Sequence, residues 1–185
     1  DSVIGQVKPF PSTLLNRVKD QWFVIDELTL AASRQDFFLN GVLDAARVAV
    51  IGYSMGGYGA LAAAGAGYNG SGMAMNVVPG GYLAELTAGN AEFGARKRDN
   101  LKALVAIAPW GAQPPYNSWS PEGLAGISIP SLCIAGDQDD VSDYAKGIRK
   151  AFDGALHSDR CLLVYANARH NVGGNPPPPE SLASM

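Results

Sequence analysis

The chain has 185 residues, 47% of them hydrophobic and 17% charged, and its formal net charge is −3. This length fits a single domain over residues 1–185, and the composition fits a packed core rather than a disordered chain. The sequence holds no basic run that would suit nucleic acid and no apolar stretch as long as a transmembrane helix, so neither partner is expected.

The first expected element is a helix at residues 20–33, where apolar side chains recur near helical spacing. An apolar strand is expected at residues 47–51, and a helix of small residues at 56–66. Two long segments then interrupt the pattern, at residues 67–100 and 111–127. Insertions of this length are more often functional than accidental, and we expect part of the second one to wall a substrate cleft.

Three more strands are expected, at residues 101–108, 130–135 and 160–165. A helix is expected at 142–156, with Ser142 as its N-cap. The strand at 47–51 is apolar without alternation, as strands of parallel sheets are. Strands that alternate with helices favour right-handed crossovers. The sequence therefore predicts an α/β fold, with a mainly parallel sheet flanked by helices.

A lone serine among glycines marks the turn between the first expected strand and the helix after it. Gly-x-Ser-x-Gly is typical of a nucleophile elbow. Gly52 and Gly56 are expected to be small because the helix passes close to the strand, and Gly57 to relieve crowding. The turn would expose the Ser54 hydroxyl at the helix N-terminus, where the Met55 N–H would stabilise an oxyanion. An ordinary turn with a capping serine is the alternative.

A serine hydroxyl is a poor nucleophile without a base and an orienting acid. Of the two histidines, His157 ends a polar helix and is expected in solvent, whereas His170 follows the fourth strand and would reach over the sheet. The acid is expected after the third strand, where the sequence offers Asp137, Asp139 and Asp140. The chain order serine, aspartate, histidine is that of an α/β-hydrolase.

The chain resembles α/β-hydrolases of the dienelactone-hydrolase-like group, nearest to the serine esterase branch that resembles platelet-activating-factor acetylhydrolases. The matching stretches are STLLNRVKDQWFVIDEL, RVAVIGYSMGGYGAL, IPSLCIAGDQDDVSDY and CLLVYANARHNVGGNPPPP. The resemblance implies hydrolysis of a carboxylic ester, small-molecule or lipid-like, through an acyl-serine intermediate. Dienelactone hydrolases proper have a cysteine nucleophile where this chain has Ser54, so dienelactone itself is not the expected substrate.

The same resemblance selects the acid of the triad. In such families the acid commonly stands three residues after the glycine that ends the strand, which is Gly136 here. This position is Asp139, with Asp140 as the alternative and Asp137 as a turn cap. Ser54, Asp139 and His170 are therefore expected within hydrogen-bond reach of one another.

Four aromatic residues are candidates to line the acyl or alcohol pocket. Trp110 is the foremost because it directly follows a strand end, and the others are Tyr53, Tyr116 and Trp119. Ordinary packing is the alternative for these three. Cys133 and Cys161 lie in adjacent expected strands and lack the spacing of a zinc site, so we expect buried thiols rather than a disulfide. No metal or cofactor is expected.

The front of the chain departs from the family. Only 53 residues precede Ser54, and they contain no expected strand. In this fold an earlier loop supplies the second oxyanion N–H. We expect the first strands of the sheet to be missing here, which would leave residues 47–51 at an open edge and allow self-association. A minimal hydrolase that takes its second donor from an insertion is the alternative.

Two other classes of function stay open, because a fold does not determine a function. One is a non-catalytic fragment or binding module, and the other is an acyltransferase or peptidase on the same scaffold. Loss of ester turnover in Ser54→Ala would separate an enzyme from a binding module.

Overall fold

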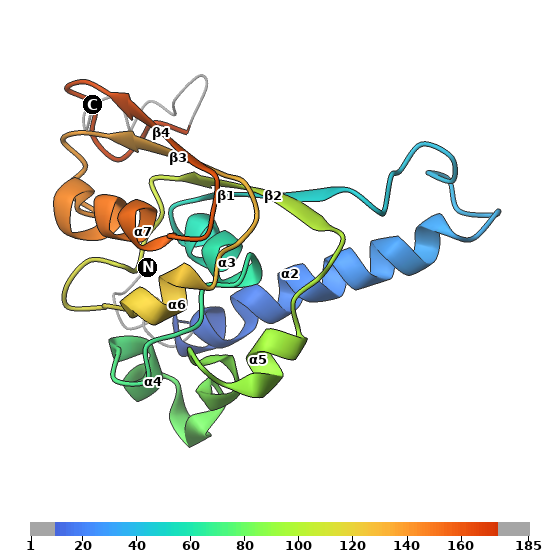
Figure 1. The fold of residues 1–185 in the computed structure, drawn as a ribbon, viewed down its shortest axis with the longest axis horizontal. Helices are drawn as coiled ribbons and strands as arrows, with labels where there is room; N and C mark the ends of the chain where they lie inside the picture. Colours follow the sequence, from blue (N-terminus) through green and yellow to red (C-terminus); the bar gives the residue numbers. More distant parts are fainter. Residues whose placement is uncertain (1–9, 174–185) are drawn as a thin grey trace, which may run out of the picture.

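Four parallel strands organise the computed structural model, which describes residues 10–173 (Figure 1). They are β1 (Val48–Tyr53), β2 (Leu101–Ile107), β3 (Ser131–Gly136) and β4 (Arg160–Tyr165). The strands lie in the order β1-β2-β3-β4, and every neighbouring pair is parallel. This is the α/β fold that the sequence predicts, with strand limits within two residues of those expected.

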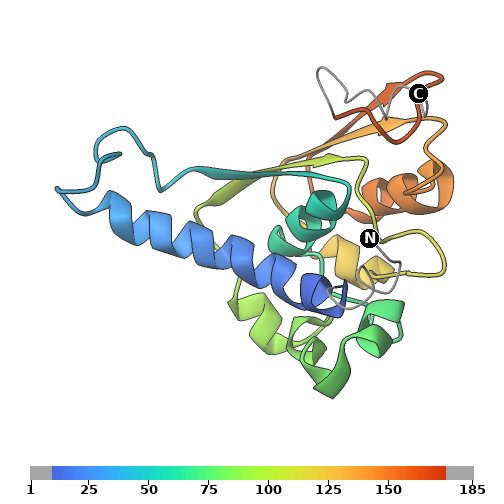
Figure 2. The same ribbon diagram turned by 180° about the vertical axis from the view of Figure 1, so that it is seen from behind.

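The helices of the described part lie on one side of this sheet (Figures 1 and 2). A strand order that never reverses, joined by crossovers of one hand, places the connecting helices on the same side. The α-helices are α2 (Phe10–Ala32), α3 (Met55–Ala63), α4 (Met73–Val77), α5 (Ala91–Ala95), α6 (Pro121–Ala125) and α7 (Arg149–Gly154). Shorter turns are η1 (Pro79–Gly81), η2 (Ala84–Leu86) and the π-helical η3 (Tyr144–Ile148).

The two faces of the sheet differ in burial. Val50, Leu104 and Cys133 point to the helices and are buried. The register pairs Ile51 with Val105 and Val105 with Leu132, so these residues share the opposite face. No helix of residues 10–173 covers that face (Figures 1 and 2), and Ile51 is 68% exposed on it.

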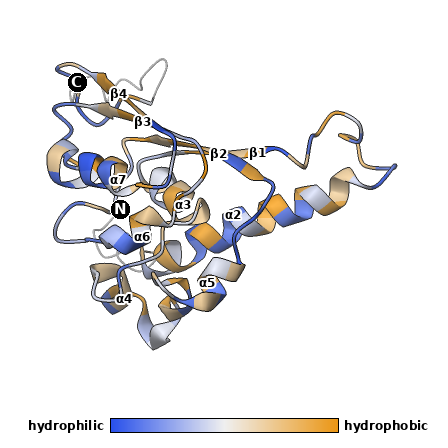
Figure 3. Cartoon of the chain, in the orientation of Figure 1, coloured by the Kyte–Doolittle hydropathy of each residue, from blue (hydrophilic) through white to orange (hydrophobic). Residues whose placement is uncertain are grey.

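Helix α2 begins ten residues before the helix that the sequence predicts. Its buried residues, Leu14, Val18, Trp22 and Ile25, recur every three or four positions and form one stripe. The rest of the helix surface is a mixture of hydrophobic and hydrophilic residues (Figure 3). The sequence obscures the start because Pro11 stands there, yet proline is tolerated in a first turn.

The first long insertion, residues 67–100, lies beneath α2 and α3, on the side away from the sheet (Figures 1 and 2). It contributes Leu83, Leu86 and Phe93 to the main core cluster. The second insertion, residues 111–127, reaches this layer through α6 and through a bridge between Trp119 and Tyr68.

Two local expectations prove wrong. The helix expected at 142–156 is a π-helical turn followed by α7, and its N-cap is Asp143, whose carboxylate accepts from the Lys146 N–H. Cys161 is exposed rather than buried, although both cysteines are free as expected. It pairs in register with Leu132 and so points to the uncovered face of the sheet.

Candidate active site

The turn between β1 and α3 holds Ser54 in an unusual backbone conformation, with φ 52° and ψ −116°. A positive φ in a non-glycine residue costs roughly 1–3 kcal/mol and persists only where the surroundings enforce it. Here the Ser54 N–H donates to the carbonyl of Ile107 at 2.9 Å. The Ser54 carbonyl accepts from the N–H groups of Tyr58 and Trp110, each at 3.1 Å. The turn is therefore tied to the end of β2 and to the loop after it.

Two of the three glycines around Ser54 are required by close packing. A Cβ at Gly52 would overlap the carbonyl group of Gly56, and a Cβ at Gly57 would lie against Pro109. A Cβ at Gly56 itself would meet nothing within 4 Å. The expectation that Gly56 is small for lack of space is therefore wrong. The backbone carbonyl of Gly56 approaches Gly52 of β1, but the position of a Gly56 Cβ is open.

Three side chains from three strand ends meet above the turn. The His170 Nε2 lies 2.9 Å from the Ser54 Oγ, and the His170 Nδ1 lies 2.9 Å from an oxygen of Asp139. Ser54 follows β1, Asp139 follows β3 and His170 follows β4. The Asp139 side chain is fully buried, whereas that of His170 is 12% exposed. One continuous chain of hydrogen bonds thus joins the carboxylate to the serine hydroxyl.

The second oxygen of Asp139 is held by the backbone. It accepts from the N–H of Val141 at 3.0 Å and from the N–H of Ser142 at 2.8 Å. The neighbouring carboxylate of Asp140 is exposed and paired with Arg169, which lowers the pKa of Asp140. Asp139 is therefore the carboxylate that contacts His170, while Asp140 points to a different partner.

The Asp137 side chain bonds another loop rather than the turn that it was expected to cap. Its carboxylate accepts from the N–H of Asn167 at 2.7 Å, which joins the loop after β3 to the loop after β4. The other histidine, His157, is exposed, and its Nδ1 lies 2.8 Å from the carbonyl of Ala125. This contact is with the last residue of α6 and not with Ser54, Asp139 or His170.

Two buried polar residues that were not anticipated as part of the site support the Asp139 loop. The Ser142 hydroxyl donates to the carbonyl of Ala108 at 3.0 Å. The Gln113 amide donates to the carbonyl of Val141 at 3.0 Å and accepts from the N–H of Gly111 at 2.7 Å. The only sign of Gln113 in the sequence is an amide among prolines in the second insertion, which spacing alone does not distinguish.

Tyr53 turns its hydroxyl toward the histidine loop. The Tyr53 Oη lies 2.8 Å from the Asn171 side-chain oxygen and 3.3 Å from the His170 carbonyl. The Tyr53 and His170 rings lie 5.4 Å apart between centroids. Partial burial and the charge of Asp139 raise the pKa of Tyr53. Asn171 was not anticipated from the sequence, where only its position next to His170 marks it.

The remaining aromatic candidates lie at different depths. The backbone N–H of Trp110 donates to the Ser54 carbonyl. The Trp110 ring is largely buried and packs on Phe10 and Tyr116, at centroid distances of 5.8 and 4.3 Å. Tyr116 is half-buried. Trp119 is 1% exposed and packs on Tyr58 in the core. Trp110 thus adjoins the Ser54 turn and Tyr116 packs on its ring, while Trp119 offers almost no surface to a ligand.

Met55 opens α3 directly after the serine. The first intrahelical bond is donated by Tyr58 to Ser54, so the N–H of Met55 precedes the bonded part of the helix. N–H groups of a first turn have no partner within their helix and favour negative charge nearby. The backbone at Met55 therefore has the chemistry that an oxyanion requires.

The fold and the site together define an α/β protein with a serine, a histidine and an aspartate joined by hydrogen bonds at the carboxyl ends of a parallel sheet. No protein-family model matches the chain. The chain is 27% identical, over 133 residues, to a bis(hydroxyethyl) terephthalate hydrolase of Streptomyces coelicolor, a hydrolase that acts on an ester. The match covers 71% of this chain and 30% of that relative's length.

Within residues 10–173 no helix combines the length and the apolar character needed to cross a bilayer.

Proposed function

We propose that this chain hydrolyses carboxylic esters as a serine hydrolase, with Ser54 as nucleophile, His170 as general base and Asp139 as the residue that orients the histidine. The observation that carries the proposal is the pair of 2.9 Å contacts from His170 to Ser54 and Asp139. The distant similarity to an ester hydrolase supports ester hydrolysis in general.

The reaction follows from these contacts. The His170 Nε2 accepts the proton of Ser54 as the Ser54 Oγ attacks the ester carbonyl carbon, and Asp139 keeps the Nδ1 proton in place. The Met55 N–H donates to the oxyanion. The tetrahedral intermediate collapses, the ester C–O bond breaks, and His170 returns its proton to the leaving alcohol. Water then repeats the sequence, which releases the acid and restores the Ser54 hydroxyl.

The substrate that we propose is a small-molecule or lipid-like ester, as in the serine esterase branch of the dienelactone-hydrolase-like group. Trp110 adjoins the Ser54 turn and, with Tyr116 packed on its ring, would form an aromatic wall for the ester. Bis(hydroxyethyl) terephthalate, the substrate in the name of the Streptomyces relative, is the first aromatic ester to test.

The test compares the hydrolysis of p-nitrophenyl butyrate by the chain with that of two pairs of variants. Ser54→Ala and His170→Ala should lower turnover by about 10⁴-fold or more, as in comparable triads. The matched controls are Ser33→Ala, at an exposed serine beyond α2, and His157→Ala, at the other histidine. Both controls should keep full turnover.

A fluorophosphonate probe gives a second readout. Attack of the Ser54 Oγ on phosphorus expels fluoride and leaves one covalent adduct, which mass spectrometry should locate on the peptide that contains Ser54. Ester turnover that survives Ser54→Ala, or an adduct on another serine, would overturn the proposed function.

A further inference from the structure

We propose that Tyr53 is a positioning residue, which holds the His170 loop over Ser54 through a hydrogen bond from its hydroxyl to Asn171. The proposal rests on the proposed function, because it concerns how the general base is kept in place. It gives Tyr53 a role other than lining the substrate pocket.

The geometry that carries the proposal is a contact between the end of β1 and the loop after β4. Tyr53 is the last residue of β1, directly before Ser54, whereas Asn171 lies in the loop after β4. The Tyr53 hydroxyl has one proton to donate. The shorter contact, 2.8 Å to the Asn171 side-chain oxygen, takes this proton in preference to the 3.3 Å contact with the His170 carbonyl.

The loop also packs on the tyrosine ring. A Cβ at Gly173 would lie 3.0 Å from a ring carbon of Tyr53, so the backbone passes close to the ring there. The Tyr53 and His170 rings lie 5.4 Å apart, at an interplanar angle of 34°. The residue before the nucleophile therefore contacts the histidine loop at His170, Asn171 and Gly173.

The histidine needs such a contact because it comes from the far edge of the sheet. The first part of its loop is anchored to the end of β3, where the Gln138 N–H donates to the Ala168 carbonyl and the Asn167 N–H donates to Asp137. These anchors lie before His170 in the chain. The Tyr53 hydroxyl adds one after it, on the strand that carries the nucleophile, and so fixes the distance between His170 and Ser54.

The decisive variant is Tyr53→Phe, which keeps the ring and removes the hydroxyl. We expect kcat to fall about three- to tenfold, as the loss of one such hydrogen bond predicts, with KM within about twofold of the original. A residue that only contacts the substrate would change KM instead. Tyr165→Phe, at an exposed tyrosine that ends β4, is the matched control and should leave both constants unchanged.

Asn171→Ala removes the acceptor of the same bond. It should lower kcat at least as far as Tyr53→Phe does, and the double variant should fall no further than Asn171→Ala alone, because the bond that Tyr53→Phe removes is already lost in Asn171→Ala. A double variant whose loss is the product of the two single losses would overturn the proposal. Circular dichroism of each variant confirms that the fold is retained.

A proton NMR signal reports the histidine without turnover. The chain has two histidines, so the His157→Ala variant assigns the downfield Nδ1–H resonance to His170. In Tyr53→Phe this resonance should broaden, because the loosened loop lets the proton exchange with water. An unchanged resonance with an unchanged kcat would overturn the positioning role. Failure of the proposed function is distinguished by a Ser54→Ala variant that stays active.

Discussion

Asp139 divides its two oxygens between two tasks: one accepts from the backbone of Val141 and Ser142, and the other faces His170. An asparagine has a single acceptor oxygen to offer. In Asp139→Asn the two backbone N–H groups would donate to this single oxygen, and the amide NH₂ would then face the His170 Nδ1. The histidine would then carry its proton on Nε2, facing Ser54, where it cannot act as a base.

We therefore predict that Asp139→Asn lowers kcat/KM on p-nitrophenyl butyrate by about 10⁴-fold, the size of the loss in a triad with the wrong histidine tautomer. Asp140→Asn is the control, since that carboxylate pairs with Arg169 in solvent, and it should stay within about threefold. A larger loss from Asp140→Asn than from Asp139→Asn would show that the acid is wrongly assigned.

The glycines of the Ser54 turn give a second prediction at this scale. Gly56→Ala should raise the free energy of unfolding by as much as about 1 kcal/mol, because the new Cβ meets nothing within 4 Å and alanine has a higher helix propensity than glycine. Gly52→Ala should lower it, since the new Cβ overlaps the Gly56 carbonyl group. Urea denaturation measures both, and equal effects of the two substitutions would contradict the packing described here.

At the scale of elements, the strands were predictable and parts of the helices were not. Each strand is a short, mainly apolar run that begins directly after a polar residue or a proline. The helix expected from residue 142 starts later because Asp143 has a φ of 54°, outside the helical region, and the Ser142 hydroxyl is held by the distant Ala108 carbonyl. Long-range partners of this kind leave no local signal in the sequence.

The residues of the candidate site show the same division. Ser54 could be predicted from the glycines around it, and His170 from the expected strand before it. The choice of Asp139 needed a family pattern, because three aspartates stand within four residues. The sequence did not indicate Gln113 or Asn171, because each contributes through a contact with a segment far along the chain.

The cysteines test which face of each strand is covered. Burial raises the pKa of the Cys133 thiol to about 12, so little of it is thiolate at neutral pH. Cys161 is exposed on the edge strand β4. A thiol reagent such as Ellman's reagent should modify one thiol per native chain rapidly and the other only on unfolding. Cys161→Ser should abolish the rapid phase, and a rapid phase that survives would place Cys133 at the surface.

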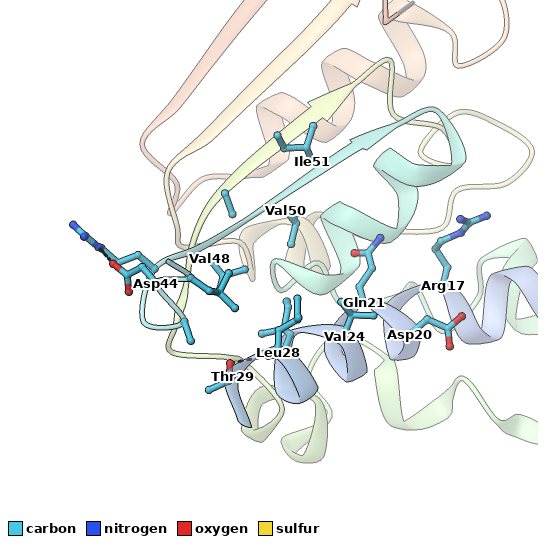
Figure 4. Close-up of a pocket in the computed structure, with 15 residues that line it drawn as sticks. Arg17, Asp20, Gln21, Val24, Leu28, Thr29, Asp44, Val48, Val50 and Ile51 are labelled. Carbon is cyan, nitrogen blue, oxygen red and sulfur yellow. Dashed lines mark hydrogen bonds and ion pairs between the residues drawn. The ribbon is translucent and has the colours of Figure 1, made fainter. Parts of the chain in front are cut away.

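At the scale of the whole molecule, an apolar groove of about 590 Å³ lies between α2 and β1. Figure 4 shows Leu28 of α2 pointing up to the strand, Val50 pointing down to the helix and Ile51 pointing to the other side of the sheet. Strand β1 has β2 as its one neighbour in the described sheet. Each end of the groove carries both charges, from Arg17 with Asp20 and from Arg47 with Asp44.

We predict that the chain self-associates through this edge. Light scattering after size-exclusion chromatography should show a mass that rises with concentration. Ile51→Lys should suppress the rise, because a lysine on an edge strand opposes strand pairing. Phe38→Lys is the control, at a residue 83% exposed outside the groove, and should not. A constant monomer mass for the original chain would refute the prediction.

Ser54 and His170 follow the two edge strands of the sheet, β1 and β4, so the proposed ester turnover would report partial unfolding at either edge. All three tryptophans lie in the main core cluster beside α2 and α3, whereas β3 and η3 pack in a second, smaller cluster that Leu162 and Val172 adjoin. Edge segments with few buried contacts open before a core does. As the urea concentration rises, the rate of ester hydrolysis should therefore fall before the tryptophan emission maximum shifts. The candidate site would then be disrupted while the larger core is still folded.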